Sequence, residues 1–185
     1  MRRWALSNDR AVPQGAVLQI FILISILLLA VTLSRPHRHR FPRFFAFESL
    51  LALILINTQS WFRDPLSLRQ LISWMFLTGS LVLALHGFRI LQIAGSPEKD
   101  IEDTTQLVTI GAYRYIRHPL YCSLLLGGVG AFLKAPSVPG FLLFTLDFIF
   151  VFVTAKVEEK DNIKRFGDEY TGYMKTTRMF FPFLI

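Results

Sequence analysis

Cysteine is almost absent from this chain of 185 residues, since Cys122 is the only one. A single cysteine excludes an intrachain disulfide framework and a metal cage built from thiolates, so nothing in the sequence requires an oxidising compartment. The sequence also lacks a strand followed by a glycine-rich loop and a helix, which excludes a Rossmann-type domain. No internal repeat or low-complexity segment is present. These absences leave the long apolar runs as the main feature of the chain.

Acidic residues are also scarce: 13 Asp and Glu stand against 20 Lys and Arg, for a net charge of +7. The basic residues lie in short segments between apolar runs and form no continuous stripe, so we expect no nucleic-acid partner and attribute them to membrane topology. His37 and His39 lie in the basic turn 36–43, without Asp, Glu or Cys nearby. We therefore expect no metal site and interpret this turn as a contact with anionic membrane lipids.

Hydrophobic residues make up 52% of the chain, more than in ordinary soluble domains. A helix needs about 20 mostly apolar residues to span a bilayer. Five runs approach that length: Gln14–Leu33, Phe44–Phe62, Leu71–Ala94, Leu120–Ala135 and Val138–Ala155. The sequence thus predicts an all-α integral membrane protein with about five transmembrane helices. Because the last two runs are separated so briefly, we expect a helical hairpin that returns the chain to the same membrane face.

The distribution of positive charge predicts how the chain is oriented. With the C-terminus in the cytoplasm, 14 of the 20 Lys and Arg face inward, which favours an N-out, C-in, multi-pass topology. The first run lies some distance after Met1 and ends without a small-residue cleavage pattern, so we expect no cleaved secretory signal. We divide the chain into 1–95, with three spans, and 96–185, with the binding region.

The segment from Gly111 to Tyr121 combines aromatic and basic side chains immediately before the fourth run. Gly111 permits a turn, and Pro119 suits the first turn of a helix. A helix N-terminus favours an anionic ligand group, so this segment could form one wall of a binding site. The alternative is an interfacial belt of aromatic and basic residues.

The segment after the fifth run has apolar and aromatic residues at near-helical spacing, which predicts an amphipathic helix at the membrane interface. Glu158 and Glu159 lie where the chain leaves the bilayer. They could be a solvated pair at a helix end. Alternatively, one carboxylate accepts hydrogen bonds from a ribose or ammonium group, or pairs with Arg117 or His118 across the mouth of the hairpin.

Several short motifs follow one another in the second half of the chain: LVTxGxYxxxRHPxY, a hairpin, EE, FGDEY, a Tyr three residues later and a closing Pro. In the order of these motifs, the chain resembles the isoprenylcysteine carboxyl methyltransferase family and related phospholipid methyltransferases. The resemblance covers about Thr105 to Pro182. It implies a methyltransferase that binds S-adenosyl-L-methionine at the cytoplasmic face and takes a lipophilic small-molecule or lipid acceptor from the bilayer. A phospholipid or lipid-amine N-methyltransferase and a non-enzymatic membrane scaffold are the alternatives.

The resemblance also implies roles for individual residues. Carried over by position, the cofactor-binding residues are Gln106, Leu107, Val108, Tyr113, His118, Pro119, Leu120, Tyr121 and Glu158. Glu159 and Arg117 are the catalytic candidates, and either Glu159 or His118 would take the proton of an amine acceptor. The GVG at Gly128–Gly130 either resembles a GxG of phospholipid-methylating relatives or allows close helix packing.

One departure from the family pattern concerns the acceptor. Carboxyl-methylating members have an Arg four residues before the conserved Glu, and this chain has Thr154 there. Lys156 could replace it, although ammonium and guanidinium groups are not equivalent at a carboxylate. Asp147, an ionisable residue inside the fifth run, could contact the acceptor or bond to another helix. The sequence therefore does not name the acceptor.

Overall fold

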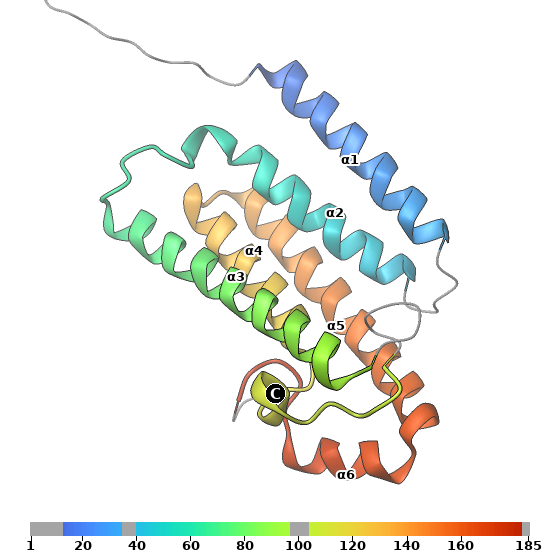
Figure 1. The fold of residues 1–185 in the computed structure, drawn as a ribbon. Coiled ribbons are helices and arrows are strands. Elements are labelled where there is room, and N and C mark those ends of the chain that lie inside the picture. The colour runs from blue at the N-terminus through green and yellow to red at the C-terminus, as the bar shows by residue number, and fades with distance from the viewer. Residues whose placement is uncertain (1–12, 35–39, 97–103, 183–185) are drawn as a thin grey trace, which may run out of the picture.

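The computed structural model describes residues 13–34, 40–96 and 104–182. His37 and His39 of the predicted basic turn and most of the acidic stretch before Thr104 lie outside these ranges, whereas residues 40–43 of that turn form the first turn of a helix. The described residues contain no strand, only an isolated bridge between Ile116 and Arg178. Their helices, shown in Figure 1, are α1 (Gln14–Ser34), α2 (Arg40–Ile56), α3 (Leu68–Ala94), α4 (Pro119–Lys134), α5 (Val138–Phe166) and α6 (Asp168–Thr176).

Three of these helices are long and apolar enough to cross a membrane: α1, α3 and α5, with 21, 27 and 29 residues. The predicted all-α class is therefore confirmed for the described residues, and these three helices could span a membrane. Helices α2 and α4 have 17 and 16 residues, which is short of the usual span of about 20. The second predicted run extended to Phe62, but α2 ends at Ile56. The next residue, Asn57, donates from its side-chain amide to the carbonyl of Ala131 on α4, at 2.9 Å.

Serine hydroxyls hold α3 against α4. Ser73 donates to the carbonyl of Gly130 and Ser80 to that of Ser123, both at 2.7 Å. A Cβ atom at Gly130 would lie 2.7 Å from Leu77 Cγ, so the glycine allows the backbones to approach closely. Gly128 does the same on the other side of α4, where a Cβ atom would lie 2.9 Å from Phe144 of α5. The GVG segment therefore lies at two tight helix contacts.

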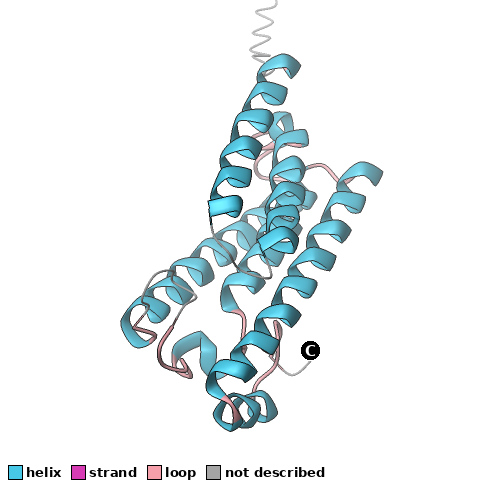
Figure 2. Cartoon of the chain, turned by 90° about the vertical axis from the view of Figure 1, so that its right-hand side faces the viewer, coloured by secondary structure: helices cyan, strands magenta, loops and turns pink. Residues whose placement is uncertain are grey.

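Helix α5 lies beside α2, with Phe45 and Phe150 stacked at a centroid separation of 5.2 Å. The largest core cluster joins these helices to α4 and to the C-terminal segment. Its buried members are Ala46, Tyr121, Leu125, Val151, Ala155, Met179 and Phe180. The core thus joins α2, α4 and α5 to the segment after α6. Figure 2 shows these helices from the side.

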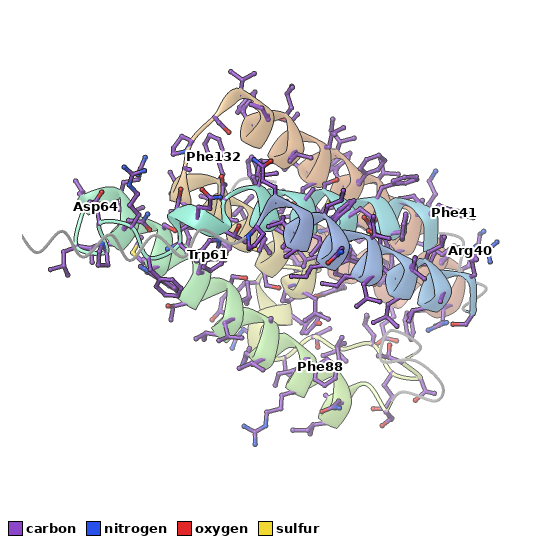
Figure 3. The ribbon with its side chains drawn as sticks, turned by 90° about the horizontal axis from the view of Figure 1, so that it is seen from above. Arg40, Phe41, Trp61, Asp64, Phe88 and Phe132 are labelled. Carbon is purple, nitrogen blue, oxygen red and sulfur yellow. The ribbon has the colours of Figure 1, made fainter. Side chains whose placement is uncertain are left out.

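A buried polar cluster closes the opposite end of the bundle. The Lys134 ammonium donates to Gln70 Oε1 at 3.0 Å and lies 3.6 Å from the centroid of the Trp74 ring. The Trp61 ring is 5.3 Å away. Figure 3 shows Trp61 at the far end of α2 from Arg40. Because a buried cation is costly unless paired, this cluster ties the α2–α3 connection to the end of α4.

The C-terminal segment folds back under the bundle. Helix α5 continues beyond its apolar part to Phe166, and Gly167, with φ of +58°, separates it from α6. The segment that the sequence predicted as one interfacial helix thus consists of the end of α5 and the whole of α6. Beyond α6, the carbonyls of Arg178 and Met179 accept the backbone N–H groups of Arg117 and His118, at 2.7 and 3.1 Å. This brings the C-terminal segment against the first turn of α4.

Candidate functional site

The loop before α4 is anchored to α3. Gly111 begins the 3₁₀ turn η2 (Gly111–Arg114) with φ of +61°, a conformation that favours glycine. A Cβ atom there would lie 2.8 Å from His86 Nε2, and the same nitrogen accepts the Ala112 N–H at 3.3 Å. Tyr113 is buried behind this turn, in a small cluster with Leu91 and Val108. The glycine therefore lets the loop pack on α3 and directs Tyr113 inward.

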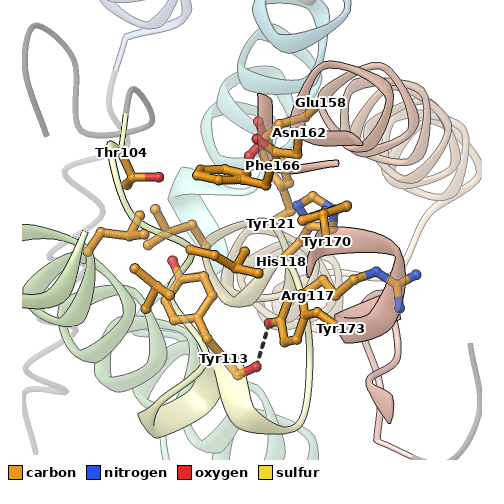
Figure 4. Close-up of a pocket in the computed structure, with 14 residues that line it drawn as sticks. Thr104, Tyr113, Arg117, His118, Tyr121, Glu158, Asn162, Phe166, Tyr170 and Tyr173 are labelled. Carbon is orange, nitrogen blue, oxygen red and sulfur yellow. Dashed lines mark hydrogen bonds between the residues drawn. The ribbon is translucent and has the colours of Figure 1, made fainter. Parts of the chain in front are cut away.

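A cavity of about 70 Å³ lies where this loop, the first turn of α4, the end of α5 and α6 meet (Figure 4). Most of the predicted site residues line it: Leu107, Val108, Tyr113, Arg117, His118, Leu120, Tyr121 and Glu158. Gln106, Pro119 and Glu159 do not. The structure thus brings both sides of the predicted site together around one cavity.

Six further residues, which were given no role in the site from the sequence, line the cavity: Leu91, Thr104, Asn162, Phe166, Tyr170 and Tyr173. Asn162 and Phe166 lie four and eight residues after Glu158, on the same helix face, so helical spacing could have identified them. The two tyrosines belong to the FGDEY segment and its following Tyr. Leu91 and Thr104 carry no sequence signal, because they reach the cavity only through tertiary packing.

The two adjacent glutamates have different environments. Glu158 faces the cavity, and its Oε2 is buried without a hydrogen-bond partner among the described residues. Glu159 is 3% exposed, and its Oε1 accepts from Arg117 Nε at 2.7 Å. Lys156 Nζ lies 3.2 Å from the other oxygen of Glu159. Consecutive helical residues point about 100° apart, and here Glu158 lines the cavity while Glu159 points toward Arg117.

Arg117 connects three segments. Besides its ion pair with Glu159, its Nη1 donates to the carbonyls of Thr177 at 2.5 Å and Met174 at 3.4 Å. The guanidinium therefore holds the loop before α4, the end of α5 and the chain after α6 in one arrangement. Charge-assisted hydrogen bonds of this kind are stronger than neutral ones.

His118 is 4% exposed and lies between aromatic rings, 5.5 Å from Tyr121 and 6.2 Å from Phe180 by centroid. Its Nε2 has no hydrogen-bond partner among the described residues, and the nearest carboxylate oxygen, Glu159 Oε1, is 3.8 Å away. The ring therefore has a nitrogen free for a ligand at the edge of the cavity.

Two tyrosines of α6 form the floor of the cavity. Burial raises the pKa of both Tyr170 and Tyr173 above the ordinary value of a phenol. Both are therefore neutral at physiological pH and can donate a hydrogen bond. The Tyr173 hydroxyl donates to the carbonyl of Tyr113, which fixes α6 against the loop (Figure 4).

The residues considered for the acceptor lie elsewhere. The Thr154 hydroxyl donates to the carbonyl of Phe150 on its own helix at 2.6 Å. The Lys156 ammonium is occupied by Glu159. Asp147 is fully buried deeper in α5, close to Gly128. None of the three lines the cavity.

The polar and aromatic groups around the cavity suit a nucleoside that carries a positively charged sulfonium and an amino-acid group, of which a volume of about 70 Å³ holds only a part. The unpartnered Oε2 of Glu158 can accept from a ribose hydroxyl or an ammonium group. The N-terminus of α4 favours a carboxylate. The rings of Tyr113, Phe166 and Tyr170 provide flat faces for a base or a cation. No group of three His, Cys, Asp or Glu side chains is placed to hold a metal ion in the described part of the chain.

Comparison with known proteins gives a consistent result. The model of the family described as phospholipid methyltransferase matches residues 68–169, more than half of the chain. This match begins with α3 and includes α4, α5 and the start of α6. It therefore contains nearly all of the residues that line the cavity.

Several curated relatives carry the name methanethiol S-methyltransferase. The chain is 42% identical over 72 residues to methanethiol S-methyltransferase 1 of Bradyrhizobium diazoefficiens, covering 38% of this chain and 24% of the relative. It is 27% identical over 143 residues to the protein of Pseudomonas deceptionensis, 74% of this chain and 48% of the relative. With the protein of Pseudomonas sp. strain GM41(2012) it shares 25% identity over 186 residues, 98% of this chain and 64% of the relative. The chain thus spans between a quarter and two thirds of the length of these relatives.

Proposed function

Because the chain belongs to the phospholipid methyltransferase family, we propose that it transfers a methyl group from S-adenosylmethionine to the sulfur of a lipophilic thiol at the membrane surface. The observation that carries this proposal is the unpartnered, buried Oε2 of Glu158, which faces a cavity lined by aromatic rings. A buried carboxylate oxygen without a partner is costly, so a ligand that donates to it is strongly favoured. The site residues predicted from the sequence are part of the same proposal.

When bound, the cofactor supplies a methyl group on a positively charged sulfur, which is already electrophilic. The chain's own residues then have to hold the donor, align the acceptor and exclude water. Glu158 accepts a hydrogen bond from the donor, and Tyr113, His118 and Tyr121 enclose it between the loop and α4. Tyr170 and Tyr173 cover the cavity from below. No protein nucleophile is required.

We assign Arg117 and Glu159, the catalytic candidates from the sequence, a positioning role. Their ion pair at 2.7 Å satisfies both side chains, and Glu159 does not line the cavity. The pair holds the loop and the C-terminal segment together, which fixes the positions of His118 and Glu158 on opposite sides of the cavity. A proton from a thiol acceptor would pass to solvent at the interface.

A thiol is favoured over the other acceptors by the shared name of the relatives, which act on a thiol by that name. A carboxylate acceptor is disfavoured because Thr154 is bonded to its own helix and Lys156 to Glu159. The lipid-amine alternative is suggested by the description of the family. It predicts methyl groups on ethanolamine headgroups.

We further propose that α2 and α4 cross the bilayer together with α1, α3 and α5, so that five segments are embedded. A helix of 17 residues is about 26 Å long, which local bilayer thinning can accommodate. The α4–α5 pair then acts as a hairpin, with the N-terminus outside and the site at the cytoplasmic face. In this arrangement residues 1–95 embed the chain and residues 96–185 bind the cofactor.

Calorimetry with S-adenosylhomocysteine on the detergent-solubilised protein tests this proposal. We expect micromolar binding by the wild type, and at least tenfold weaker binding by Glu158→Ala and by His118→Ala. Glu169→Ala, whose carboxylate lies at the start of α6 outside the cavity, serves as the control. Absence of binding by the wild type would refute the enzymatic proposal and favour a scaffold.

A further inference from the structure

A second, larger cavity adjoins the first. It has a volume of about 330 Å³ and lies between α1, α2, α3 and α4. Leu120 and Tyr121 line both cavities, so the first turn of α4 is a shared wall. A volume of this size falls in the range of small-molecule sites. It is much more than a one-carbon thiol needs.

The hydrogen bonds between helices give the position of each wall. Asn57 and Ala131 bond near the ends of α2 and α4, and Arg43 and Tyr121 near their beginnings line the same cavity, so the two helices run parallel. Ser25 of α1 bonds to Glu48 of α2 at 2.8 Å, and Thr32 lies seven residues after Ser25 and lines the same cavity as Arg43, five residues before Glu48. Helices α1 and α2 therefore run antiparallel. The polar side chains Arg43, Thr32 and Tyr121 therefore gather at the end of the chamber next to the cofactor pocket.

The other end of the chamber is apolar. Leu28, Phe47 and Leu124 lie about one helical turn further along their helices from Thr32, Arg43 and Tyr121. One turn corresponds to about 5.4 Å toward the middle of the bundle. The chamber thus runs from a polar, positively charged end to a hydrocarbon end, as an amphipathic ligand requires.

The wall formed by α1 is the least tightly packed of the four. No residue of α1 is buried, whereas α4 has many buried residues. Leu27, beside Leu28, is 63% exposed on the outer face of α1. A ligand dissolved in the membrane can therefore reach the chamber beside α1 without entering water.

We propose that this chamber binds the methyl acceptor, and that the acceptor is a thiol with a single alkyl chain of several carbons. This inference rests on the proposed function. The sulfur lies at the Tyr121 end and the chain runs along Leu124 and Leu28. The thiol loses its proton to water, and the Arg43 guanidinium stabilises the resulting anion. The sulfur forms a bond to the methyl carbon as the bond from that carbon to the donor sulfonium breaks, and the products are a thioether and S-adenosylhomocysteine.

The ratio of methylation rates with octanethiol and methanethiol tests the chamber. Leu28→Trp fills it from α1, so we expect the ratio to fall at least tenfold relative to the wild type. Leu27→Trp adds the same ring on the lipid-facing side and should leave the ratio unchanged. Partitioning of the thiols into detergent is the same for both variants and cancels. An unchanged ratio in Leu28→Trp would overturn the proposal.

A second pair of variants covers the case in which Leu28→Trp does not fold. Ala84→Phe fills the chamber from α3, and Leu85→Phe, whose wild-type side chain is 61% exposed, is its control.

Substitution of Arg43 tests the charge at the polar end of the chamber. Arg43→Gln should lower kcat/KM for octanethiol at least tenfold, and Arg43→Lys by less. Equal values for Arg43→Gln and the wild type would exclude the role of this charge.

Binding of S-adenosylhomocysteine, measured on the same samples, distinguishes a wrong chamber assignment from a wrong proposed function. Wild-type protein that binds this ligand and methylates methanethiol but not octanethiol would overturn the chamber assignment alone, whereas methylation of ethanolamine headgroups only would overturn the thiol acceptor of the proposed function as well. Wild-type protein that does not bind it would refute the proposed function itself.

Discussion

Exchanging each of the two adjacent glutamates for glutamine should affect two different properties. Glu158 faces the cavity with an unpartnered oxygen, whereas Glu159 is paired with Arg117. Glu158→Gln removes the charge that a ligand would use but breaks no bond that the structure shows. Glu159→Gln leaves the Arg117 guanidinium without its anionic partner. We therefore expect Glu158→Gln to weaken cofactor binding and Glu159→Gln to lower stability.

The expected magnitudes follow from the contacts. A hydrogen bond to a charged group contributes about 1.5 to 3 kcal/mol, so Glu158→Gln should weaken S-adenosylhomocysteine binding by roughly 10- to 100-fold. Breaking a buried ion pair costs about 3 to 5 kcal/mol, and Gln can still accept one hydrogen bond. We therefore expect a loss of about 2 kcal/mol for Glu159→Gln. In a chain of this size that lowers Tm by roughly 4 to 8 °C.

Calorimetry and thermal unfolding in the same detergent measure both effects. The Tm of Glu158→Gln should stay within about 1 °C of the wild-type value while its affinity for S-adenosylhomocysteine falls. The main effect of Glu159→Gln should be a lower Tm. Wild-type affinity in Glu158→Gln would refute the assignment of this carboxylate to the ligand. An unchanged Tm in Glu159→Gln would refute the structural role of the ion pair.

Three further outcomes are expected. Gln70→Ala should lower the free energy of unfolding by about 1 to 3 kcal/mol, because it leaves the buried Lys134 ammonium without its acceptor. Lys134→Met, which removes the charge itself, should lower it by less, and thermal unfolding measures both. Gly128→Ala should destabilise by about 1 to 3 kcal/mol, since its Cβ atom would press on α5, and an unchanged Tm would contradict the packing. In a spectrophotometric titration, Tyr170 and Tyr173 should ionise above the usual phenol range, because burial raises their pKa values. Their neutral forms favour the folded state below about pH 10, and this contribution to the free energy of unfolding is lost as the pH rises further.

The sequence predicts the helical class and the general position of the site because both depend on patterns that local physics determines. Apolar runs of sufficient length form helices in a membrane, and a short connection between α4 and α5 keeps their outer ends close. This is why residues as distant as Tyr113 and Glu158 were expected together and line one cavity in the structure.

Other features depend on tertiary contacts that composition does not contain. The bond from Asn57 to the Ala131 carbonyl forms only because the ends of α2 and α4 pack together. The difference between Glu158 and Glu159 depends on the rotation of α5 about its axis, and Leu91 reaches the cavity only because α3 packs beside the loop. Asn162 and Phe166 are different, since helical spacing from Glu158 would have identified them.

Transfer of a labelled methyl group from S-adenosylmethionine, followed by identification of the labelled product, tests the central claim most directly. The purified protein is incubated with octanethiol and, separately, with phosphatidylethanolamine vesicles. We predict label in methyl octyl thioether, formed in equal amount with S-adenosylhomocysteine and lost in Glu158→Gln. Label on ethanolamine alone, or no transfer to either acceptor by protein that binds S-adenosylhomocysteine, would contradict this account.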